Sequence, residues 1–378
     1  MRVVVLGGWA PSLLKFRGPL LAAMVQRGHH VTAMAADPDP ETTAGLRAIG
    51  VDFQAIGVER AGLDPRRDGR LIWELRQRLR ALRAELVLSY TIKPVVYGSL
   101  AALAAGVPRR AALITGLGYA FAPPTNLQHR AVAAIARTMY RVGLASCQTV
   151  FFQNPDDRAE FLRLGLLPTA ARVEIVRGSG VDVDHYAVAP LNLSDYRTDS
   201  PSLNFLFVGR LLIDKGIREY AEMAAAVRRV RPGCRFAVAG WLDPNPSSVT
   251  QAQLAAWIAD ETIEYLGPLT DIRPALRAAQ VLVLPSYREG TPRSVLEAMS
   301  MGRAIITTDA PGCRETIIDG EQGFLVPVRD AEALTRAAVS LIDDVALLQR
   351  MGAAARHRIA QLYDARAVAG HMLDTLEL

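Results

Sequence analysis

The 378-residue sequence contains three cysteines, few aromatic residues (6%) and no apolar stretch that approaches the roughly 20 residues needed to span a bilayer. Cys147, Cys234 and Cys313 lie far apart and match no zinc-ligand spacing, and so sparse a set fits a reducing compartment. The chain opens on an apolar β-type run, "MRVVVLGG", with no signal-peptide organisation. Together these features predict a cytoplasmic protein.

Half of the residues are hydrophobic and 21% are charged, which is the composition of a globular protein. The length suggests two domains, each able to bury its own core. The formal net charge of +5 favours anionic partners such as nucleotides, sugar phosphates, anionic lipids or nucleic acid, and does not choose among them.

Short apolar runs rich in β-branched residues alternate with segments of helical spacing along the whole chain. Six runs lie in the first half, at residues 2–7, 30–36, 52–58, 85–90, 111–116 and 147–153. Six more lie at 204–209, 234–240, 262–267, 280–285, 303–309 and 323–327. Continuous apolar strands between helices indicate parallel sheets covered on both faces, the doubly wound α/β arrangement.

A polar, turn-rich stretch interrupts this alternation. We therefore predict two Rossmann-like domains, residues 1–188 and 203–359, joined by a linker at 189–202. The last helical segment, 360–378, has no strand partner and is expected to return to the first domain. Because ligands of open α/β sheets bind beyond the carboxyl ends of the strands, two such domains facing each other predict a site in an interdomain cleft.

A candidate phosphate site follows the apolar run 280–285, in "SYREGTPRSVLEAM" at residues 286–299. Thr291 suits the N-cap of a helix, and Pro292 suits the first helical position, where its missing N–H costs nothing. The first-turn amides would then point out of the helix and, with the helix dipole, bind a phosphate. These amides belong to Arg293, Ser294 and Val295.

Two carboxylates flank that turn. Glu289 could accept hydrogen bonds from sugar hydroxyls and Glu297 from a ribose diol, although either alone is more simply a solvated residue. The stretch "FVGRLLIDKGI" at 207–217 makes a binding role for the two glutamates the favoured interpretation. Arg210, directly after a strand, must turn into the cleft or pair, and Lys215 begins a helix nearby. Both cations would lie at the carboxyl edge of the sheet and could neutralise a diphosphate leaving group.

The motifs of the second half resemble one known family. They are "VGRLLIDKG", two glutamates separated by seven residues at 289–297, "GPLTDI" at 267–272 and "EAMSMGRAIITTDAPGCRETIIDGEQGFLV" at 297–326. In order and spacing they are similar to those of the retaining family 4 glycosyltransferases of GT-B fold, over nearly the whole second domain.

This resemblance implies a donor site. Arg210 and Lys215 would contact the diphosphate of a nucleotide sugar, and with Glu289, which would hold the transferred hexose, they are the catalytic residues. Glu297 would hold the ribose. The other donor-binding residues, which line the phosphate loop or lie near the base, are Gly290, Thr291, Arg293, Leu266 and Gly267. No cofactor is expected. The nucleotide-sugar donor is a substrate, and UDP is expected to be its nucleotide.

The first domain narrows the resemblance. "SLLKFRGPLLAAMVQRGHHVTAMA" and "SYTIKPVVYGSLAALAAGVPRRAALITGLGYAF" are similar to bacterial enzymes that extend undecaprenyl-diphosphate-linked sugars. Within that group they most resemble the α-1,3-N-acetylgalactosaminyltransferases of N-glycan assembly and related O-antigen or capsule enzymes. The loops after these strands would face a lipid-linked saccharide acceptor. The implied acceptor-binding residues are Arg17, Lys93, Thr115, Gly116 and Tyr119.

The sequence departs from the family in one loop. Many family 4 relatives carry a histidine where this chain has "ITGLG", at residues 114–118. The histidines His29, His30, His129 and His185 fall elsewhere, at expected helix ends, on the surface or in the linker. A mechanism that needs a histidine in that loop is therefore not supported.

Glycosyl transfer passes through an oxocarbenium-like state while the nucleotide diphosphate departs, so the catalyst must stabilise charge on the leaving phosphate. Arg210, Lys215 and the start of the helix after Pro292 could do this without a metal. Asp182 and Asp184 form the Asp-x-Asp pattern of metal-dependent glycosyltransferases. We expect no metal there, because "GVD" at the linker is usual in GT-B relatives. Retention without a covalent enzyme intermediate is likewise implied by the family.

Residues 66–86 form a basic segment with leucines at helical spacing and Trp73 off that stripe. An interfacial helix of this kind would bind anionic lipid on the inner face of the cytoplasmic membrane. An ordinary Rossmann helix, with leucines against the sheet and arginines in water, explains the same pattern. Both interpretations stay open at this point.

Three other functions compete with glycosyl transfer. A UDP-sugar epimerase on the same two-domain plan is the main alternative, and interconversion of free nucleotide sugars without an acceptor would reveal it. A dinucleotide-dependent oxidoreductase is disfavoured, because "GGWAPS" after the first strand lacks the G-x-G-x-x-G pattern. No nucleic-acid-binding motif accompanies the modest positive charge.

Overall fold

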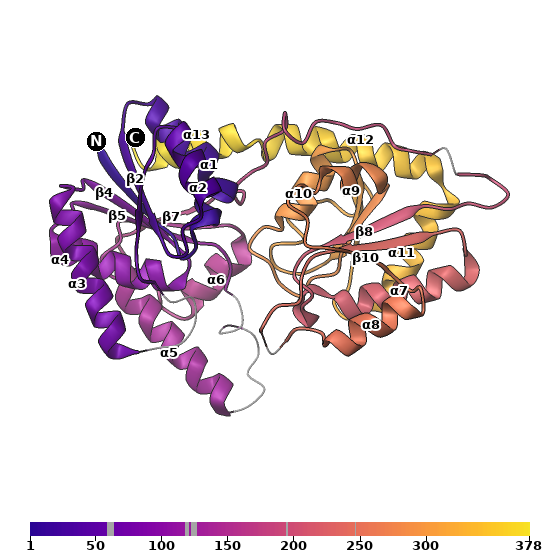
Figure 1. Cartoon of the computed structure of the whole chain (residues 1–378), viewed down its shortest axis with the longest axis horizontal. Coiled ribbons are helices and arrows are strands. Elements are labelled where there is room, and N and C mark those ends of the chain that lie inside the picture. Colours follow the sequence, from indigo (N-terminus) through magenta and orange to yellow (C-terminus); the bar gives the residue numbers. More distant parts are fainter. Residues whose placement is uncertain (59–63, 118–120, 122–126, 194–195, 246) are drawn as a thin grey trace. The chain divides into compact units, whose positions relative to one another are not determined.

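The computed structural model describes residues 1–58, 64–117, 121, 127–193, 196–245 and 247–378 (Figure 1). The chain forms two compact units, one made of Met1–Ser179 with Ala365–Leu378 and the other of Gly180–Asp364. Each unit contains a parallel sheet flanked by helices, so the predicted α/β architecture with two Rossmann-like domains is confirmed.

The first unit holds a seven-stranded sheet in the order β3-β2-β1-β4-β5-β6-β7. Its strands are β1 (Arg2–Leu6), β2 (His30–Ala35), β3 (Asp52–Ala55), β4 (Leu86–Tyr90), β5 (Arg109–Ile114), β6 (Thr149–Phe152) and β7 (Arg172–Ile175). Its helical segments are α1 (Ala10–Gln26), α2 (Pro40–Ala48), α3 (Pro65–Ala81), η1 (Pro94–Gly98), α4 (Ser99–Ala105), α5 (Leu127–Leu144), α6 (Pro155–Arg163) and α13 (Ala365–Thr375). The apolar runs predict the first six strands and miss β7, in which charged and apolar residues alternate at the sheet edge.

Alternate side chains of β1 enter two different layers of the first unit. Val3 and Val5 pack with α1, α2 and α13, whereas Val4 and Leu6 pack with the leucines of α3. This alternation follows from the two-residue period of a strand. It places α1 and α2 on one face of the sheet and α3, α4 and α5 on the other. Right-handed crossovers require this, because successive strands are added on one side of β1 up to β3 and on its other side from β4 onward.

The second unit holds a six-stranded parallel sheet in the order β10-β9-β8-β11-β12-β13. Its strands are β8 (Asn204–Val208), β9 (Arg235–Ala239), β10 (Glu264–Gly267), β11 (Val281–Leu284), β12 (Ala304–Thr308) and β13 (Gly323–Val326). Its helical segments are η3 (Ile213–Lys215), α7 (Ile217–Val230), α8 (Gln251–Ala259), α9 (Arg273–Ala278), α10 (Arg293–Ser300), α11 (Ala331–Asp343) and α12 (Val345–Leu362). All six strands coincide with the predicted runs.

The boundary between the units falls after Ser179, ahead of the linker predicted at 189–202. The reason is that the intervening residues are bonded into the second unit. The amide of Val181 donates to the carbonyl of Tyr363 (2.8 Å), and the fully buried guanidinium of Arg303 donates to carbonyls at the start of the predicted linker. At the other end the return to the first unit begins with α13, which packs on α1.

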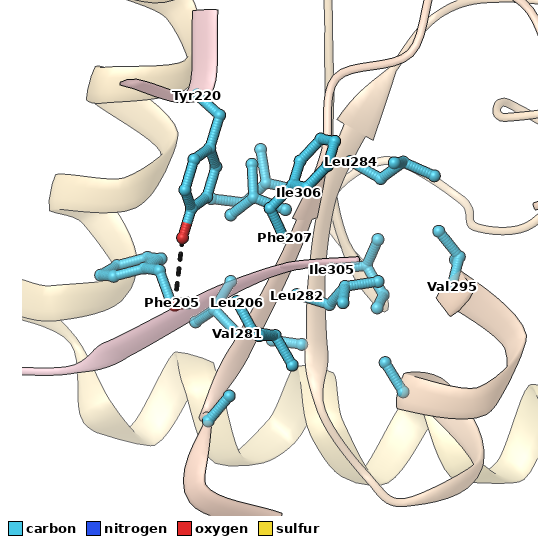
Figure 2. Packing of buried hydrophobic residues seen from close by; sticks show 14 of the residues in the cluster. Phe205, Leu206, Phe207, Tyr220, Val281, Leu282, Leu284, Val295, Ile305 and Ile306 are labelled. Carbon is cyan, nitrogen blue, oxygen red and sulfur yellow. Dashed lines mark hydrogen bonds between the residues drawn. The ribbon is translucent and has the colours of Figure 1, made fainter. Parts of the chain in front are cut away.

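Tyr220 of α7 ties two strands of the second sheet together. Its ring is fully buried among apolar side chains, and its hydroxyl reaches down to the backbone of β8 (Figure 2). The hydroxyl oxygen lies 3.1 Å from the carbonyl of Phe205 on β8 and 2.9 Å from that of Ala237 on β9. Burial raises the pKa of Tyr220 well above its ordinary value, so the hydroxyl keeps its proton and remains a donor.

Tyr220→Phe should therefore destabilise the second unit by about 1–3 kcal/mol, because buried carbonyls lose their donor. Hydrogen exchange measured by mass spectrometry should become faster in peptides covering β8 and β9. Peptides from β1 and β4 serve as the internal control and should be unchanged. Unaltered exchange throughout the second unit would show that the hydroxyl contributes nothing.

Candidate active site

The loops after β8 and β11 approach each other closely at the carboxyl edge of the second sheet. Gly216, at the end of η3, has a φ of +74°, and a Cβ there would overlap the carbonyl of Pro285. The amide of Tyr287 donates to the carbonyl of Asp214 (2.9 Å). Only glycine permits both this backbone conformation and this approach, so the "DKG" sequence fixes Lys215 beside the β11 loop.

Lys215 forms an ion pair with Glu289 across these two loops. The hydroxyl of Ser286 donates to the same carboxylate oxygen at 2.7 Å, and both members of the pair are largely buried. Two residues that the sequence analysis selects independently therefore meet in the structure. Ser286 was not predicted, because only its place at the end of an apolar run distinguishes it in the sequence.

The backbone of Glu289 is held from behind by the loop after β12. Its amide donates to the carbonyl of Pro311 (2.9 Å). Gly312 has a φ of +82°, and a Cβ there would overlap the carbonyl of Glu289. The amide of Gly312 in turn donates to the carboxylate of Glu315 at 2.8 Å. These contacts with the loop after β12 fix the backbone position of Glu289, from which its side chain extends.

Helix α10 starts one residue later than predicted. Pro292, with ψ of 108°, is the N-cap and Arg293 is the first helical residue, so Thr291 lies outside the helix. The proline ring fixes φ but not ψ, and its φ suits either position, which is why the sequence does not distinguish them. The amide of Val295 donates to the carbonyl of Pro292 (3.2 Å). The first-turn amides outside the intrahelical ladder are thus those of Arg293 and Ser294, not the predicted three.

Glu297 is buried and paired within its own helix. The Nε of Arg293 lies 2.6 Å from its carboxylate, one helical turn away. Tyr186 lies against this pair, and burial together with the Glu297 carboxylate raises the pKa of Tyr186 above its usual range. The sequence does not predict a site role for Tyr186, although this residue directly follows the Asp-x-Asp stretch "GVDVDH".

Arg210 lies directly after β8, as predicted, and it pairs with a carboxylate. Its Nη1 is 3.3 Å from Oδ2 of Asp243, in the loop after β9, and 42% of the Arg210 side chain is exposed. The neighbouring strand end carries the two residues expected near the base, Leu266 and Gly267. The amide of Gly240 donates to the carbonyl of Gly267 (2.9 Å), which joins the ends of β9 and β10.

The Asp-x-Asp sequence forms a local turn. Oδ1 of Asp182 accepts hydrogen bonds from the amides of Asp184 and His185, each at 3.0 Å. Within the part of the chain that the structure describes, no group of three or more His, Cys, Asp or Glu side chains could hold a metal ion.

Cys313 lies behind Glu289 and is fully buried. Burial and the nearby Glu289 carboxylate raise the pKa of its thiol to about 12. The thiol is therefore neutral at physiological pH and acts as a packing residue.

Two known families match this chain. Residues 202–344 match the family described as glycosyl transferases group 1, and residues 18–179 match the family described as glycosyl transferase 4-like domain. Both matched regions are therefore glycosyltransferase domains, and the chain is a glycosyltransferase.

Two similar sequences agree with that assignment. This glycosyltransferase is 28% identical, over 99% of its length and 97% of the relative, to the N,N'-diacetylbacillosaminyl-diphospho-undecaprenol alpha-1,3-N-acetylgalactosaminyltransferase of Campylobacter jejuni. It is 26% identical, over 74% of its length and 72% of the relative, to the UDP-Gal:alpha-D-GlcNAc-diphosphoundecaprenol alpha-1,3-galactosyltransferase of Escherichia coli.

Solved structures define the fold as GT-B. The glycosyltransferase aligns with Anabaena HepE in complex with UDP at a TM-score of 0.77 and 18% identity, over 100% of both chains. It aligns with sucrose-phosphate synthase from Thermosynechococcus elongatus at a TM-score of 0.79 and 18% identity, over 100% of this chain and 98% of the other.

The residues expected to bind the acceptor lie in the first unit. Arg17 is 4% exposed, with its guanidinium 5.1 Å from the centre of the Tyr90 ring, and Lys93 is 7% exposed, with its Nζ 3.7 Å from Asp68. Thr115 and Gly116 follow β5 and are half-buried. Tyr119 lies outside the described residues. The structure thus pairs each cation with a group of its own unit, and their contact with an acceptor stays a prediction.

Gly312→Ala should lower glycosyl transfer at least tenfold, because its methyl group must displace the backbone of Glu289, and sub-ångström precision decides such sites. Gly320→Ala is the matched control. Gly320 also has a positive φ (+79°), but its Cβ would meet nothing within 4 Å. Both variants carry a backbone strain of about 1–2 kcal/mol, and Gly312→Ala should lower the unfolding temperature further, because its Cβ also overlaps the backbone of Glu289. Equal activity losses in the two variants would contradict the role given to Gly312.

Proposed function

We propose that this glycosyltransferase moves an N-acetylhexosamine, with retention of configuration, from a UDP-sugar to an undecaprenyl-diphosphate-linked saccharide in cell-surface glycan assembly. The observation that carries the proposal is the ion pair of Lys215 with Glu289, with Arg210 following β8 at the same carboxyl edge of the sheet. The names of the Campylobacter and Escherichia relatives, both of which act on diphospho-undecaprenol saccharides, support the acceptor class.

The chemistry requires the bond between the hexose anomeric carbon and the diphosphate to break while negative charge builds on the leaving oxygen. Arg210, Lys215 and the first-turn amides of α10 supply fixed positive charge at that place. Each well-placed donor of this kind is worth roughly 3–4 kcal/mol of barrier, judged from oxyanion-hole variants. The site has this capacity from protein groups alone, which supports transfer without a metal.

The two carboxylates serve binding rather than covalent catalysis in this proposal. Glu289, held by Lys215 and Ser286, accepts hydrogen bonds from hydroxyls of the hexose. Glu297, held by Arg293, accepts from the ribose. Because carboxylates that are already oriented lose little freedom on binding, the hexose can be fixed in one pose.

Glu289→Gln and Arg210→Ala should each lower the turnover number by at least 100-fold with a polyprenyl-diphosphate saccharide acceptor, because each removes a group that acts on the reacting hexose or the leaving phosphate. Glu332→Gln, at an exposed glutamate of the same unit, is the control and should be fully active. Transfer is measured with radiolabelled UDP-N-acetylhexosamines, and thermal unfolding checks the fold. Undiminished turnover in both site variants would refute the site. Interconversion of free UDP-N-acetylglucosamine without an acceptor would instead establish the epimerase alternative.

We further propose that the first unit binds the membrane that holds the lipid-linked acceptor. No helix in the described ranges is both long and apolar enough to cross a bilayer. However, residues 1–179 and 365–378 contain 24 Lys and Arg against 15 Asp and Glu, a net charge of +9, whereas 180–364 contain 19 against 23, a net charge of −4. A surplus of that size attracts an anionic surface, at about 1 kcal/mol for each cation close to it.

Helix α3 divides its residues between core and surface. Leu71, Leu75 and Leu79 are buried against the sheet, as an ordinary Rossmann helix requires. Trp73 is 60% exposed, and exposed arginines occupy the first turns of the helix. The exposed face therefore combines an amphipathic ring with cations, which is the combination that an interfacial helix uses.

Trp73→Ala should weaken binding to vesicles containing anionic lipid about tenfold, because the partly buried indole contributes of the order of 1.5 kcal/mol. Co-sedimentation at increasing salt concentrations measures this binding. Trp241→Ala removes an exposed tryptophan of the second unit (48% exposed) and should leave vesicle binding unchanged. Equal binding by the wild type and the Trp73 variant would exclude α3 from the membrane contact.

A further inference from the structure

The loop after β9 is bonded side by side to the segment that carries Arg210. The amide of Leu211 donates to the carbonyl of Trp241 (3.0 Å), and that of Ile213 donates to the carbonyl of Ser247 (2.8 Å). The amide of Val249 returns a bond to the carbonyl of Leu211 (2.9 Å). The two loops therefore form a single rigid piece at the carboxyl edge of β8 and β9.

Asp243 is held within this pair of loops by two hydrogen bonds to residues of its own loop. Its Oδ1 accepts from the amide of Asn245 at 2.9 Å, and its amide donates to the hydroxyl of Ser248 at 3.3 Å. Its second carboxylate oxygen, Oδ2, is directed at Nη1 of Arg210. The Asp243 side chain is 18% exposed and bonded within its own loop, whereas that of Arg210 is 42% exposed, so the carboxylate is the anchor of the pair.

A guanidinium has five N–H donors, and the contact with Asp243 uses one of its two terminal nitrogens. The other donors remain able to contact a phosphate. A cation stabilises a leaving group best when its position is set before the reaction, because no reorganisation is then needed as charge develops. A long side chain held only by solvent does not meet that condition.

We propose that Asp243 is a positioning residue for catalysis, which holds Arg210 where the departing diphosphate of the donor develops its charge. This inference rests on the proposed function of Arg210. It assigns a role to a carboxylate outside the glutamate pair, and it explains why the β9 loop is built from successive side-chain-capped turns at Asp243 and Asn245.

Asp243→Asn tests the charge without removing the loop. The amide oxygen of asparagine can still accept from the amide of residue 245, so the turn is retained while the ion pair is lost. The turnover number should fall about tenfold, because the mobile guanidinium no longer meets the leaving group. The donor KM should stay within about twofold, because removing a neighbouring negative charge offsets the lost orientation in the ground state. Asp243→Glu, which keeps the charge, should recover part of the rate.

A double-mutant comparison separates positioning from a structural role. Arg210→Ala and the double variant with Asp243→Asn should transfer at the same rate, because Asp243 acts through Arg210. Single-turnover reactions with enzyme in excess keep such slow rates measurable. The inference is overturned if Asp243→Asn lowers the rate equally with and without Arg210, or if it raises KM and lowers the unfolding temperature at unchanged turnover. Wild-type turnover by Arg210→Ala alone would instead overturn the proposed function.

Discussion

The ion pair between Lys215 and Glu289 is the contact on which the rest of the site depends. It joins the loops after β8 and β11, which are neighbours in the sheet although β9 and β10 intervene in the sequence. The chain proceeds from β8 to one side of the sheet and later returns to the other side, and ligands of such sheets bind beyond the carboxyl ends of the strands at this switch point. The pair, together with Gly216, fixes how closely the two loops approach each other.

The cations of the site share one electrostatic arrangement. Arg210, Lys215 and Arg293 are each held by a carboxylate, from Asp243, Glu289 and Glu297 respectively. Such pairing keeps the unliganded site close to neutral, and it fixes cations that would otherwise repel one another. The same pairing makes each group dependent on its partner, because removal of one member leaves the other partly buried and uncompensated. In the proposed function, a diphosphate would bind by taking over hydrogen-bond donors that are already in place.

The sequence predicts most of the strands and selects candidate residues for the nucleotide-sugar site, but it does not predict the contacts that orient those residues. Buried parallel strands are recognisable because their residues are continuously apolar, and β7 escapes detection because Arg172 and Glu174 interrupt it. Arg210 stands out because a charge directly after such a strand must face a ligand or a partner, and Glu289 stands out only together with its neighbouring motifs. Asp243 and Gly312 do not stand out, since their roles depend on loops that meet only in the folded sheet. The N-cap of α10 was misplaced by one residue because proline leaves ψ undetermined.

The uneven charge of the two units fits the different ligands that the proposed function gives them. In that proposal the second unit binds a diphosphate although its net charge is negative, because affinity there would depend on a few cations at one sheet edge and not on the total charge. The first unit carries its positive surplus on exposed helices such as α3, while its candidate acceptor cations Arg17 and Lys93 are buried. Exposed charge acts over about a Debye length, roughly 8 Å at physiological salt, which suits attraction to a surface. Buried charge acts only on contact, so in the proposed function an acceptor diphosphate would reach Lys93 either by displacing Asp68 or after movement of the lysine side chain.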